Sequence, residues 1–455
     1  MAAPARGQWT GKLGFILAAA GSAIGLGNIW RFPYIAGENG GGAFVLVYLG
    51  FVILIGIPVL LSELSIGRFT KLNPVGALRK LAPGTKWKWL GALGVLTGFG
   101  ILAFYSVVAG WTLSYLWGAL TGQFGGVTTA EESGAVFSAL IGGSFVPLFL
   151  TAIFMALTIV VVRGGVAGGI ERATRILMPT LLIVLVIMAI RAMTLEGGMA
   201  GVSYLFQPDF SKLSMSVILA ALGQALFSLS LGMGAMITYG SYFPDSENLP
   251  QAGITVAFFD TGIAVLAGLI IFPALFSVGV SPNGGPGLVF VVLPSIFAQL
   301  PAGGLFAIAF YFLLSIAALT STISLLEVVV SYFVDERGWE RKKAALAIGS
   351  ACFVLAVPSA LSQGAVGFLT NFLGTGFSFL DLQNIIWGNY SLSIGALGLC
   401  LFVGWKWGIP AATQALQSSG HKLPAAALWS ILVRFVCPVG VAAILAYIIV
   451  TQQYF

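Results

Sequence analysis

Eleven apolar runs constrain this chain more than any other feature. They lie near residues 11–37, 42–67, 89–119, 144–162, 168–194, 216–242, 250–278, 303–334, 342–358, 378–404 and 425–450. A helix of about 20 residues crosses the hydrocarbon core of a bilayer, and each run approaches or exceeds that length. Charged residues make up only 8% of the 455 positions, whereas a soluble protein carries roughly 25%. The sequence therefore predicts an all-α polytopic membrane protein whose main partner is the lipid bilayer.

Cysteine, histidine and net charge exclude several function classes. The three cysteines lie in apolar runs, and His421 is the only histidine. A disulfide scaffold, a transition-metal site and histidine-based catalysis are therefore not expected, and we expect no enzymatic activity. The net charge of +6 could indicate a nucleic-acid partner, but the basic residues gather in short loops between the apolar runs. We therefore expect no nucleic acid to bind.

Loop charges predict the orientation in the membrane. The loop after the second run carries six basic residues and no acid, namely Arg68, Lys71, Arg79, Lys80, Lys86 and Lys88, and the loop after the eighth carries Arg337, Arg341, Lys342 and Lys343. Basic loops stay on the cytoplasmic side, which places the N-terminus in the cytoplasm and, after an odd number of spans, the C-terminus outside. A surface for acidic lipid is the alternative use of these charges.

The first and sixth runs are interrupted in the same way. The first contains GSAIGLGNIW, with Ser22 and Asn28 beside its Gly-x-Gly, and the sixth contains SLSLGMGAM, with Ser228 and Ser230. Glycine alone could simply permit close helix packing. Two matching interruptions, each with polar neighbours, favour broken helices in a pair of inverted five-helix repeats. The expected divisions are a tail and first repeat at 1–194, a second repeat at 195–404, and a loop with the eleventh helix at 405–455.

A helix broken inside a membrane must use its exposed backbone groups. They are tolerated only where they line a cavity or bind something. Carbonyl ends attract cations and N–H ends attract anions, so one site could hold a zwitterion together with cations. The nearby ligands are carbonyls, hydroxyls, Asn and Asp, which suit a hard cation such as sodium.

Ionisable residues inside apolar runs are candidate functional groups. Asp260, in VAFFDTGIAV, is the expected cation-site carboxylate. Glu63, in LLSELSIG, either has a similar role or accepts N–H bonds that hold an unwound helix open. Glu327 follows the hydroxyl cluster in TSTISLLE, and we expect a structural role for it.

Three segments resemble the neurotransmitter:sodium symporter family. The stretch LGFILAAAGSAIGLGNIWRFPYIAGENGGGAF resembles the family's first helix, ALGQALFSLSLGMGAMITYGSY its sixth, and LTSTISLLE its eighth. The resemblance runs through all eleven runs and is specific to the bacterial amino-acid transporter branch. It implies eleven transmembrane helices in the five-plus-five inverted repeat, and sodium-coupled amino-acid uptake by alternating access across a bacterial inner membrane.

The resemblance implies two sodium sites. The first would use Ala23, Asn28, Ser228 and Asp260, and a substrate carboxylate would complete it. The second would use carbonyls and hydroxyls of Gly21, Ile24, Ala317, Thr320 and Ser321. Because Asp260 stands where many relatives have asparagine, its fixed charge should replace a bound chloride, so chloride is not expected as a cofactor.

The resemblance also implies a substrate site. Its expected members are Ala23, Gly25, Leu26, Gly27, Ile101, Tyr105, Val108, Phe227, Ser230, Met233, Ser321 and Leu325. Tyr105 and Phe227 would form a lid towards the outside. Met233 stands between two glycines where some relatives have phenylalanine, and methionine adapts to irregular shapes. The predicted substrate is a large hydrophobic or aromatic L-amino acid.

Two gates are implied by the same comparison. At the outer gate Arg31 would face Asn384, which replaces the family's usual aspartate, and the nearby Asp381 is a candidate substitute. The inner gate would contain Arg6, Trp9, Ser241, Tyr242 and Asp335. The expected assembly is a monomer or a weak homodimer.

Two other transport mechanisms compete with this interpretation. A transporter of the same fold could couple to protons or to nothing, although the hydroxyl cluster then lacks a purpose. A channel would need a continuous polar pore rather than a few polar residues at the membrane midplane.

Overall fold

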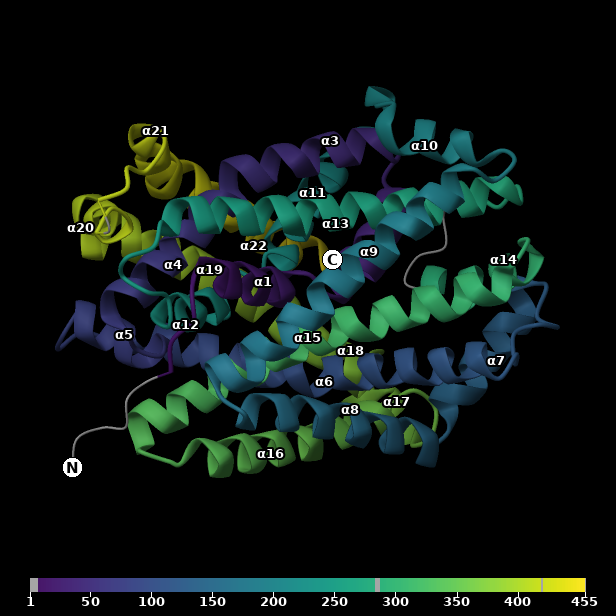
Figure 1. Ribbon diagram of the computed structural model, residues 1–455, viewed down its shortest axis with the longest axis horizontal. Helices are drawn as coiled ribbons and strands as arrows, with labels where there is room; N and C mark the ends of the chain where they lie inside the picture. Colours follow the sequence, from purple (N-terminus) through teal and green to yellow (C-terminus); the bar gives the residue numbers. More distant parts are fainter. Residues whose placement is uncertain (1–6, 283–286, 419, 455) are drawn as a thin grey trace.

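The computed structural model describes residues 7–282, 287–418 and 420–454, and these residues are almost entirely helical (Figure 1). An isolated β-bridge joins Gly41 to Pro208. The expected all-α fold is therefore confirmed.

The first five expected spans are helical, and short helices lie in some of their connections. Their bounds are α1 (Lys12–Ala23), η1 (Gly27–Arg31), α2 (Phe32–Glu38), α3 (Gly42–Phe51), η2 (Val52–Gly56), α4 (Ile57–Thr70), α5 (Pro74–Leu81), α6 (Lys88–Leu120), α7 (Ala130–Gly142), α8 (Phe145–Arg163), η3 (Val166–Glu171) and α9 (Arg172–Met193). The short helix α5 begins where the Asn73 side chain accepts the main-chain N–H groups of Val75 and Gly76. This cap satisfies two of the donors that a helix start leaves without partners.

The remaining spans follow in the same manner. Their bounds are α10 (Gly198–Phe206), η4 (Phe210–Lys212), α11 (Met215–Ser228), α12 (Ala235–Ser241), α13 (Leu249–Ser277), η6 (Leu288–Val292), α14 (Leu293–Gln299), α15 (Gly303–Arg337), α16 (Arg341–Leu361), α17 (Gly367–Thr370), η7 (Phe372–Gly374), α18 (Phe379–Gln383), η8 (Asn384–Ser391), α19 (Leu392–Leu401), η9 (Phe402–Gly408), α20 (Ile409–Leu416), α21 (Ala426–Ile431), η10 (Leu432–Val436) and α22 (Cys437–Thr451).

Nine of the helices among the described residues are long and apolar enough to cross a membrane. The bent pair Lys12–Ala23 and Gly27–Glu38, at 52°, makes a tenth. The sixth expected span is split into α11, with 14 residues, and α12, with 7. Eleven spans and the inverted repeat therefore stay predictions. Residues 405–416, expected to belong to a loop, lie in η9 and α20, which meet at Gly408 with a φ of 95°. The division of the chain into repeats stays a prediction.

Both expected helix breaks are present. The first helix stops at Ala23 and resumes at Gly27. The sixth stops at Ser228 and resumes at Ala235, and between them Ser230, Gly232 and Gly234 have positive φ angles of 54°, 86° and 74°. Glycine adopts that conformation without cost, which explains the Gly-x-Gly of the sixth span.

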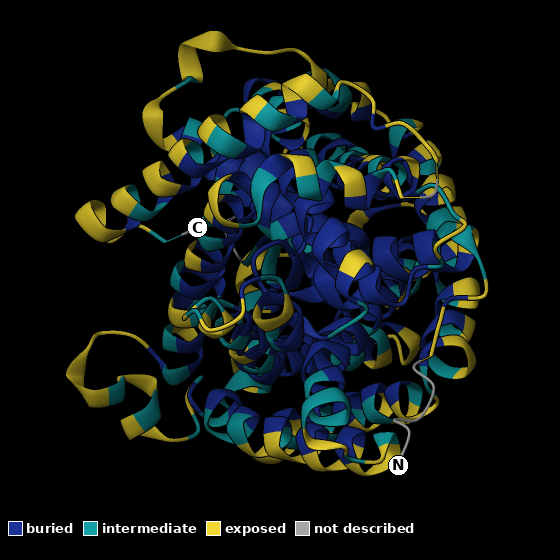
Figure 2. Ribbon diagram, turned by 90° about the vertical axis from the view of Figure 1, so that its left-hand side faces the viewer, coloured by how far each residue is buried: buried dark blue, intermediate teal, exposed yellow. Residues whose placement is uncertain are grey.

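Buried residues fill the centre of the bundle, and exposed residues line its rim (Figure 2). The long helices α6 and α15 pack against each other. Large apolar side chains point outwards, for example Phe145 and Leu305, which are 75% and 70% exposed. Such a surface suits lipid rather than water, and with the long apolar helices it identifies a multi-pass membrane protein.

Helices α4 and α12 approach unusually closely. A Cβ atom added to Gly67 would lie 2.0 Å from the main-chain oxygen of Ile237, and one added to Gly240 would lie 2.8 Å from that of Leu64. Glycine on both helices is therefore what lets these backbones touch.

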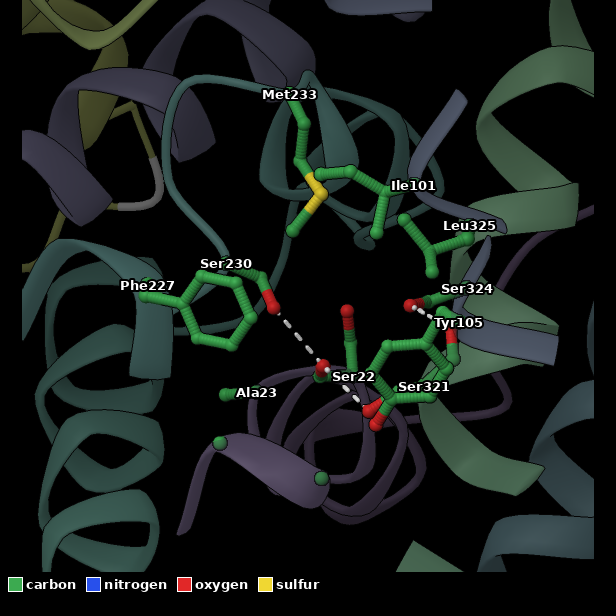
Figure 3. A pocket seen from close by; sticks show the side chains of 12 residues that line it. Ser22, Ala23, Ile101, Tyr105, Phe227, Ser230, Met233, Ser321, Ser324 and Leu325 are labelled. Atoms are coloured by element: carbon green, nitrogen blue, oxygen red, sulfur yellow. Dashed lines mark hydrogen bonds between the residues drawn. The ribbon is translucent and has the colours of Figure 1, made fainter. Parts of the chain in front are cut away.

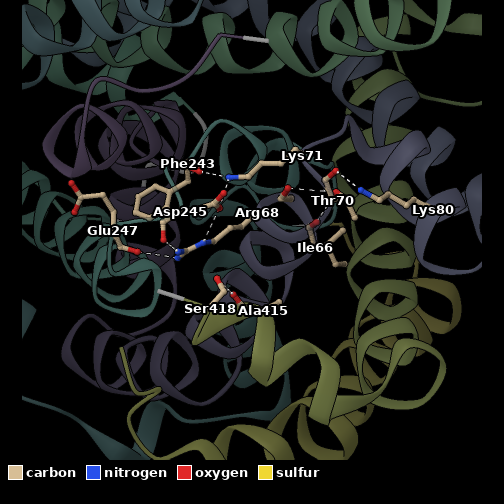
Figure 4. Close-up of polar contacts among 11 residues, drawn as sticks. Ile66, Arg68, Thr70, Lys71, Lys80, Phe243, Asp245, Glu247, Ala415 and Ser418 are labelled. Carbon is tan, nitrogen blue, oxygen red and sulfur yellow. Dashed lines mark hydrogen bonds and ion pairs between the residues drawn. The ribbon is translucent and has the colours of Figure 1, made fainter. Parts of the chain in front are cut away.

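The end of α4 is tied to the segment after α12. Arg68 is 2% exposed and donates to the main-chain oxygens of Asp245, at 2.6 Å, and Glu247, at 3.0 Å (Figure 4). Lys71 forms an ion pair of 2.8 Å with the Asp245 carboxylate. We call the end of the bundle that holds Arg68, Trp9 and Asp335 the inner end, because the loop charges predict that it faces the cytoplasm, and the opposite end the outer end.

Candidate functional site

The two broken helices bring the predicted side chains of the first sodium site together. The amide of Asn28 donates to Asp260 Oδ1 at 2.7 Å and to Ser228 Oγ at 3.1 Å. The Ser228 hydroxyl donates to Asp260 Oδ2 at 2.7 Å. All three residues are at most 1% exposed. They come from η1, the end of α11 and the middle of α13, so the fold assembles this cluster from segments far apart in sequence.

The carboxylate of Asp260 gives this cluster a fixed negative charge among neutral oxygens. Asn28 also holds the break in the first helix, because its Oδ1 accepts the N–H of Gly25 at 3.1 Å. Tyr48 adds a hydroxyl 3.5 Å from Ser228. Among the described residues there is no group of three or more His, Cys, Asp or Glu that could hold a metal ion. The oxygen set suits a monovalent hard cation better than a transition metal.

The predicted second sodium site gathers where α15 passes the break in the first helix. Thr320 Oγ1 lies 3.0 Å from the Ala317 oxygen and 3.4 Å from the Ile24 oxygen. Ser321 Oγ lies 3.4 Å from the same Ile24 oxygen. Gly21 packs on this group, since a Cβ atom there would lie 3.3 Å from Thr320 Cβ. All five predicted residues therefore lie together, and none of them carries a formal charge.

A cavity lies beside the breaks of the first and sixth helices, against α6 and α15 (Figure 3). Its lining residues are Ser22, Ala23, Gly25, Gly27, Ile101, Tyr105, Phe227, Ser230, Met233, Ser321, Ser324 and Leu325. Ten of these belong to the predicted substrate set. The sequence reasoning missed Ser22 and Ser324, although each stands within three residues of a predicted one, and hydroxyls inside an apolar helix were the available signal.

We call the cavity just described the inner cavity. The other two predicted substrate residues line a second cavity, the outer cavity, on its outer side. Leu26 and Val108 border this space, whose empty volume is about 530 Å³. Tyr105 and Phe227 line both cavities, so they lie between them, as expected of a lid. The hydroxyl of Tyr105 accepts the N–H of Leu26 at 2.9 Å, which binds α6 to the broken first helix.

The break itself leaves no space for a side chain. A Cβ atom on Gly25 would lie 2.3 Å from Ser321 Oγ and 2.7 Å from the Tyr105 hydroxyl. Glycine at position 25 therefore lets the Ser321 and Tyr105 side chains approach the break closely.

The outer gate residues meet in an unexpected way. The Arg31 guanidinium lies 4.2 Å from the centroid of the Phe227 ring, a cation–π contact between the predicted outer-gate arginine and the predicted lid. Arg31 and Asn384 line the same outer cavity. Asp381 instead accepts bonds from Ser378, which caps α18, and it forms no ion pair with Arg31 within the described part of the chain. Its role as a substitute gate residue stays a prediction.

The inner end is closed by a dense network. Trp9 is 2% exposed, donates its ring N–H to the Tyr239 oxygen at 3.0 Å, and packs edge-on against Tyr242. Tyr242 donates to Glu327 at 2.6 Å, and Glu327 pairs with Arg341, which gives Glu327 the expected structural role.

Two further inner-gate residues bond to the main chain, and one cannot be placed. Asp335 accepts the N–H of Asn73 at 3.0 Å, and Ser241 donates to the Thr238 oxygen. Arg6 lies outside the described residues.

Glu63 does what one of its two interpretations expected. Its Oε1 accepts the N–H of Gly232 at 2.7 Å and so holds the unwound part of the sixth helix. The carboxylate is fully buried. Its contact with the loop that carries Met233 links α4 to the wall of the inner cavity.

Known proteins resemble this chain over almost its whole length. A sequence profile of the sodium:neurotransmitter symporter family matches residues 6–131 and 142–454. The uncharacterized sodium-dependent transporter YhdH of Bacillus subtilis is 40% identical over 435 residues, which is 95% of this chain and 96% of YhdH. An uncharacterized sodium-dependent transporter of Haemophilus influenzae is 38% identical and covers 96% of this chain and 97% of its own length.

A solved structure agrees with these relatives. The crystal structure of MhsT in complex with L-phenylalanine superposes with a TM-score of 0.88 at 48% identity, and covers 97% of this chain and 99% of MhsT. The expected family is confirmed, and transport rather than catalysis is the activity of that family. This chain belongs to the sodium:neurotransmitter symporter family.

Proposed function

We propose that this protein is a symporter that uses a sodium gradient to import a large hydrophobic or aromatic L-amino acid. The observation that carries the proposal is the position of the Asp260 cluster near a cavity whose wall includes large apolar side chains. The cluster supplies a buried negative charge, and the cavity supplies Ile101, Phe227, Met233 and Leu325 for a side chain.

The proposed coupling of sodium to substrate follows because the first sodium site and the substrate site would each lack a partner that the other bound species supplies. Asn28, Ser228 and Asp260 would hold a sodium ion, and the substrate carboxylate would be its further ligand. The same carboxylate would lie near the N–H groups of the broken first helix, whose dipole favours an anion. Because each bound species completes the binding site of the other, sodium and amino acid would bind together or not at all.

The similar solved structure supports the proposed substrate class, and so does the cavity. MhsT was crystallised with L-phenylalanine. Met233 lies in the non-helical stretch between Gly232 and Gly234, where a flexible thioether can adapt to side chains of different shape. Two sodium ions per cycle, chloride independence and a bacterial inner-membrane location are parts of the same proposal.

Alternating access would use the two closures in turn. The outer closure consists of Arg31 stacked on Phe227, with Tyr105 beside it. The inner closure consists of the Trp9 and Glu327 network. Opening either one exposes the inner cavity to one side of the membrane only.

The decisive experiment is uptake of radiolabelled tryptophan, phenylalanine and leucine into proteoliposomes. An inward sodium gradient is compared with an equal potassium gradient, and Asp260→Asn is the matched variant. Accumulation with sodium alone, which requires a much higher sodium concentration in the variant, is the expected result. Uptake that follows an imposed pH gradient under potassium would favour the proton-coupled alternative. Equal accumulation under both cations without a pH gradient would refute coupling to sodium.

A further inference from the structure

Four serine hydroxyls line the inner cavity, and three of them have main-chain partners. Ser230 donates to the Ser22 oxygen at 3.0 Å, and Ser324 donates to the Ser321 oxygen at 2.9 Å. Ser321 lies 3.4 Å from the oxygens of Ser22 and Ile24. The Ser22 hydroxyl has no hydrogen-bond partner among the described residues.

This hydroxyl is buried and directed at the cavity. Ser22 is 1% exposed, and its side chain points into the space between Phe227 and Tyr105 (Figure 3). Buried hydroxyls are nearly always hydrogen-bonded, and leaving one without a partner is costly. A substrate that brings a polar atom to this point therefore gains affinity over one that does not.

Apart from Tyr105 and the three hydrogen-bonded serines, the remaining side chains of the cavity wall are apolar. Ile101, Phe227, Met233 and Leu325 surround the space that Ser22 enters. A strongly polar or charged side chain would lose its water there without enough partners. The wall is therefore complementary to a large apolar group with one hydrogen-bonding atom at its edge.

We propose that Ser22 is a specificity-determining residue that hydrogen-bonds the polar edge of an aromatic side chain. The inference rests on the proposed function and narrows its substrate class to aromatic amino acids with a ring N–H or O–H, namely tryptophan and tyrosine. The hydroxyl accepts from an indole N–H, or exchanges a bond with a phenol. Phenylalanine and leucine fill the same space but leave Ser22 without a partner.

The test compares two ligands of nearly the same shape. L-Tryptophan and L-3-(benzothienyl)alanine differ in one ring atom, because sulfur replaces the N–H, and their dissociation constants are measured on the purified full chain in sodium. A neutral hydrogen bond predicts that tryptophan binds about five-fold tighter to the native protein. In Ser22→Ala the ratio should fall to about one, through weaker binding of tryptophan.

The matched control is Ser324→Ala, which removes a hydroxyl of the same cavity that donates to the main chain. It should keep the five-fold ratio, whatever it does to both affinities. A ratio near one in the native protein, or an equal loss of both ligands in Ser22→Ala, overturns the assignment. The native comparison needs no variant, so a folding defect cannot obscure it. If tryptophan, phenylalanine and leucine all fail to bind in sodium, the proposed function itself is wrong.

Discussion

The two predicted sodium sites lie on either side of the same helix break, but they contain different kinds of ligand. In the first, Asn28 and Ser228 both bond to the Asp260 carboxylate at 2.7 Å. In the second, Thr320 and Ser321 lie 3.0–3.4 Å from main-chain oxygens and share no charged group.

The first site would bind sodium mainly through a charge, whereas the second would bind it mainly through the arrangement of neutral oxygens. A buried carboxylate attracts a cation strongly because little water screens it. Neutral oxygens attract it only when several lie at the right distance at once. The second site spans two elements, the break after Ala23 and the helix α15, so a small displacement between them should empty it. We expect the first site to determine the strength of sodium binding and the second to report the conformation.

Removal of the charge should have the largest effect. Asp260→Asn keeps the size of the side chain but loses the negative charge, and its NH2 group replaces one of the two oxygens that accept from Asn28 and Ser228. Interactions with charged groups contribute about 1.5–3 kcal/mol, which corresponds to a rise of roughly 10- to 100-fold in the sodium concentration for half-maximal uptake. Uptake measured over a range of sodium concentrations checks this value. A change of less than three-fold would mean that the carboxylate is not a sodium ligand.

Removal of one neutral oxygen should have a smaller effect. Ser321→Ala should raise the half-maximal sodium concentration by about five-fold, the value of a single neutral interaction of about 1 kcal/mol. The matched control is Thr322→Ala on the same helix, because Thr322 bonds to Leu319 and Thr158 instead of the break. If both variants behave alike, the effect comes from α15 and not from the second site.

Replacement of chloride should have the smallest effect. Asp260 already supplies a fixed negative charge beside Ser228, so gluconate in place of chloride should change uptake by less than about two-fold. Sodium-driven uptake in paired chloride and gluconate buffers is the measurement. A collapse of transport in gluconate would contradict the assignment of that charge.

The sequence predicts the first site better than the second for a physical reason. A single carboxylate in an apolar run, such as Asp260, needs a partner, so the sequence alone indicates a role for it. Serine and threonine inside helices usually bond back to their own helix. Thr320 does this, at 3.3 Å from the Ile316 oxygen, and it also reaches Ile24. Only the family resemblance, not the chemistry, identified it as a candidate ligand.

Other features depend on tertiary contacts that no local pattern encodes. The stacking of Arg31 on Phe227 joins two helices far apart in the chain. Asp381 was a gate candidate because of its charge, but it caps its own helix, a local use that Ser378 three residues earlier could have indicated. Gly408 and Pro410 mark a boundary between two helical segments, because Gly408 has a φ of 95° and Pro410 lies in the first turn of α20.

The glycine contact between α4 and α12 joins the two helices so closely that we expect them to move as one rigid unit. Three contacts join them in turn. Glu63 accepts the Gly232 N–H, Gly67 packs against Ile237, and Arg68 donates to a main-chain oxygen in the segment after α12. Fastened at these points, the two helices should tilt as one body rather than slide. A rotation of α4 and α12 that begins at the inner end should therefore move the loop around Met233 by the same angle, and this loop forms part of the cavity wall.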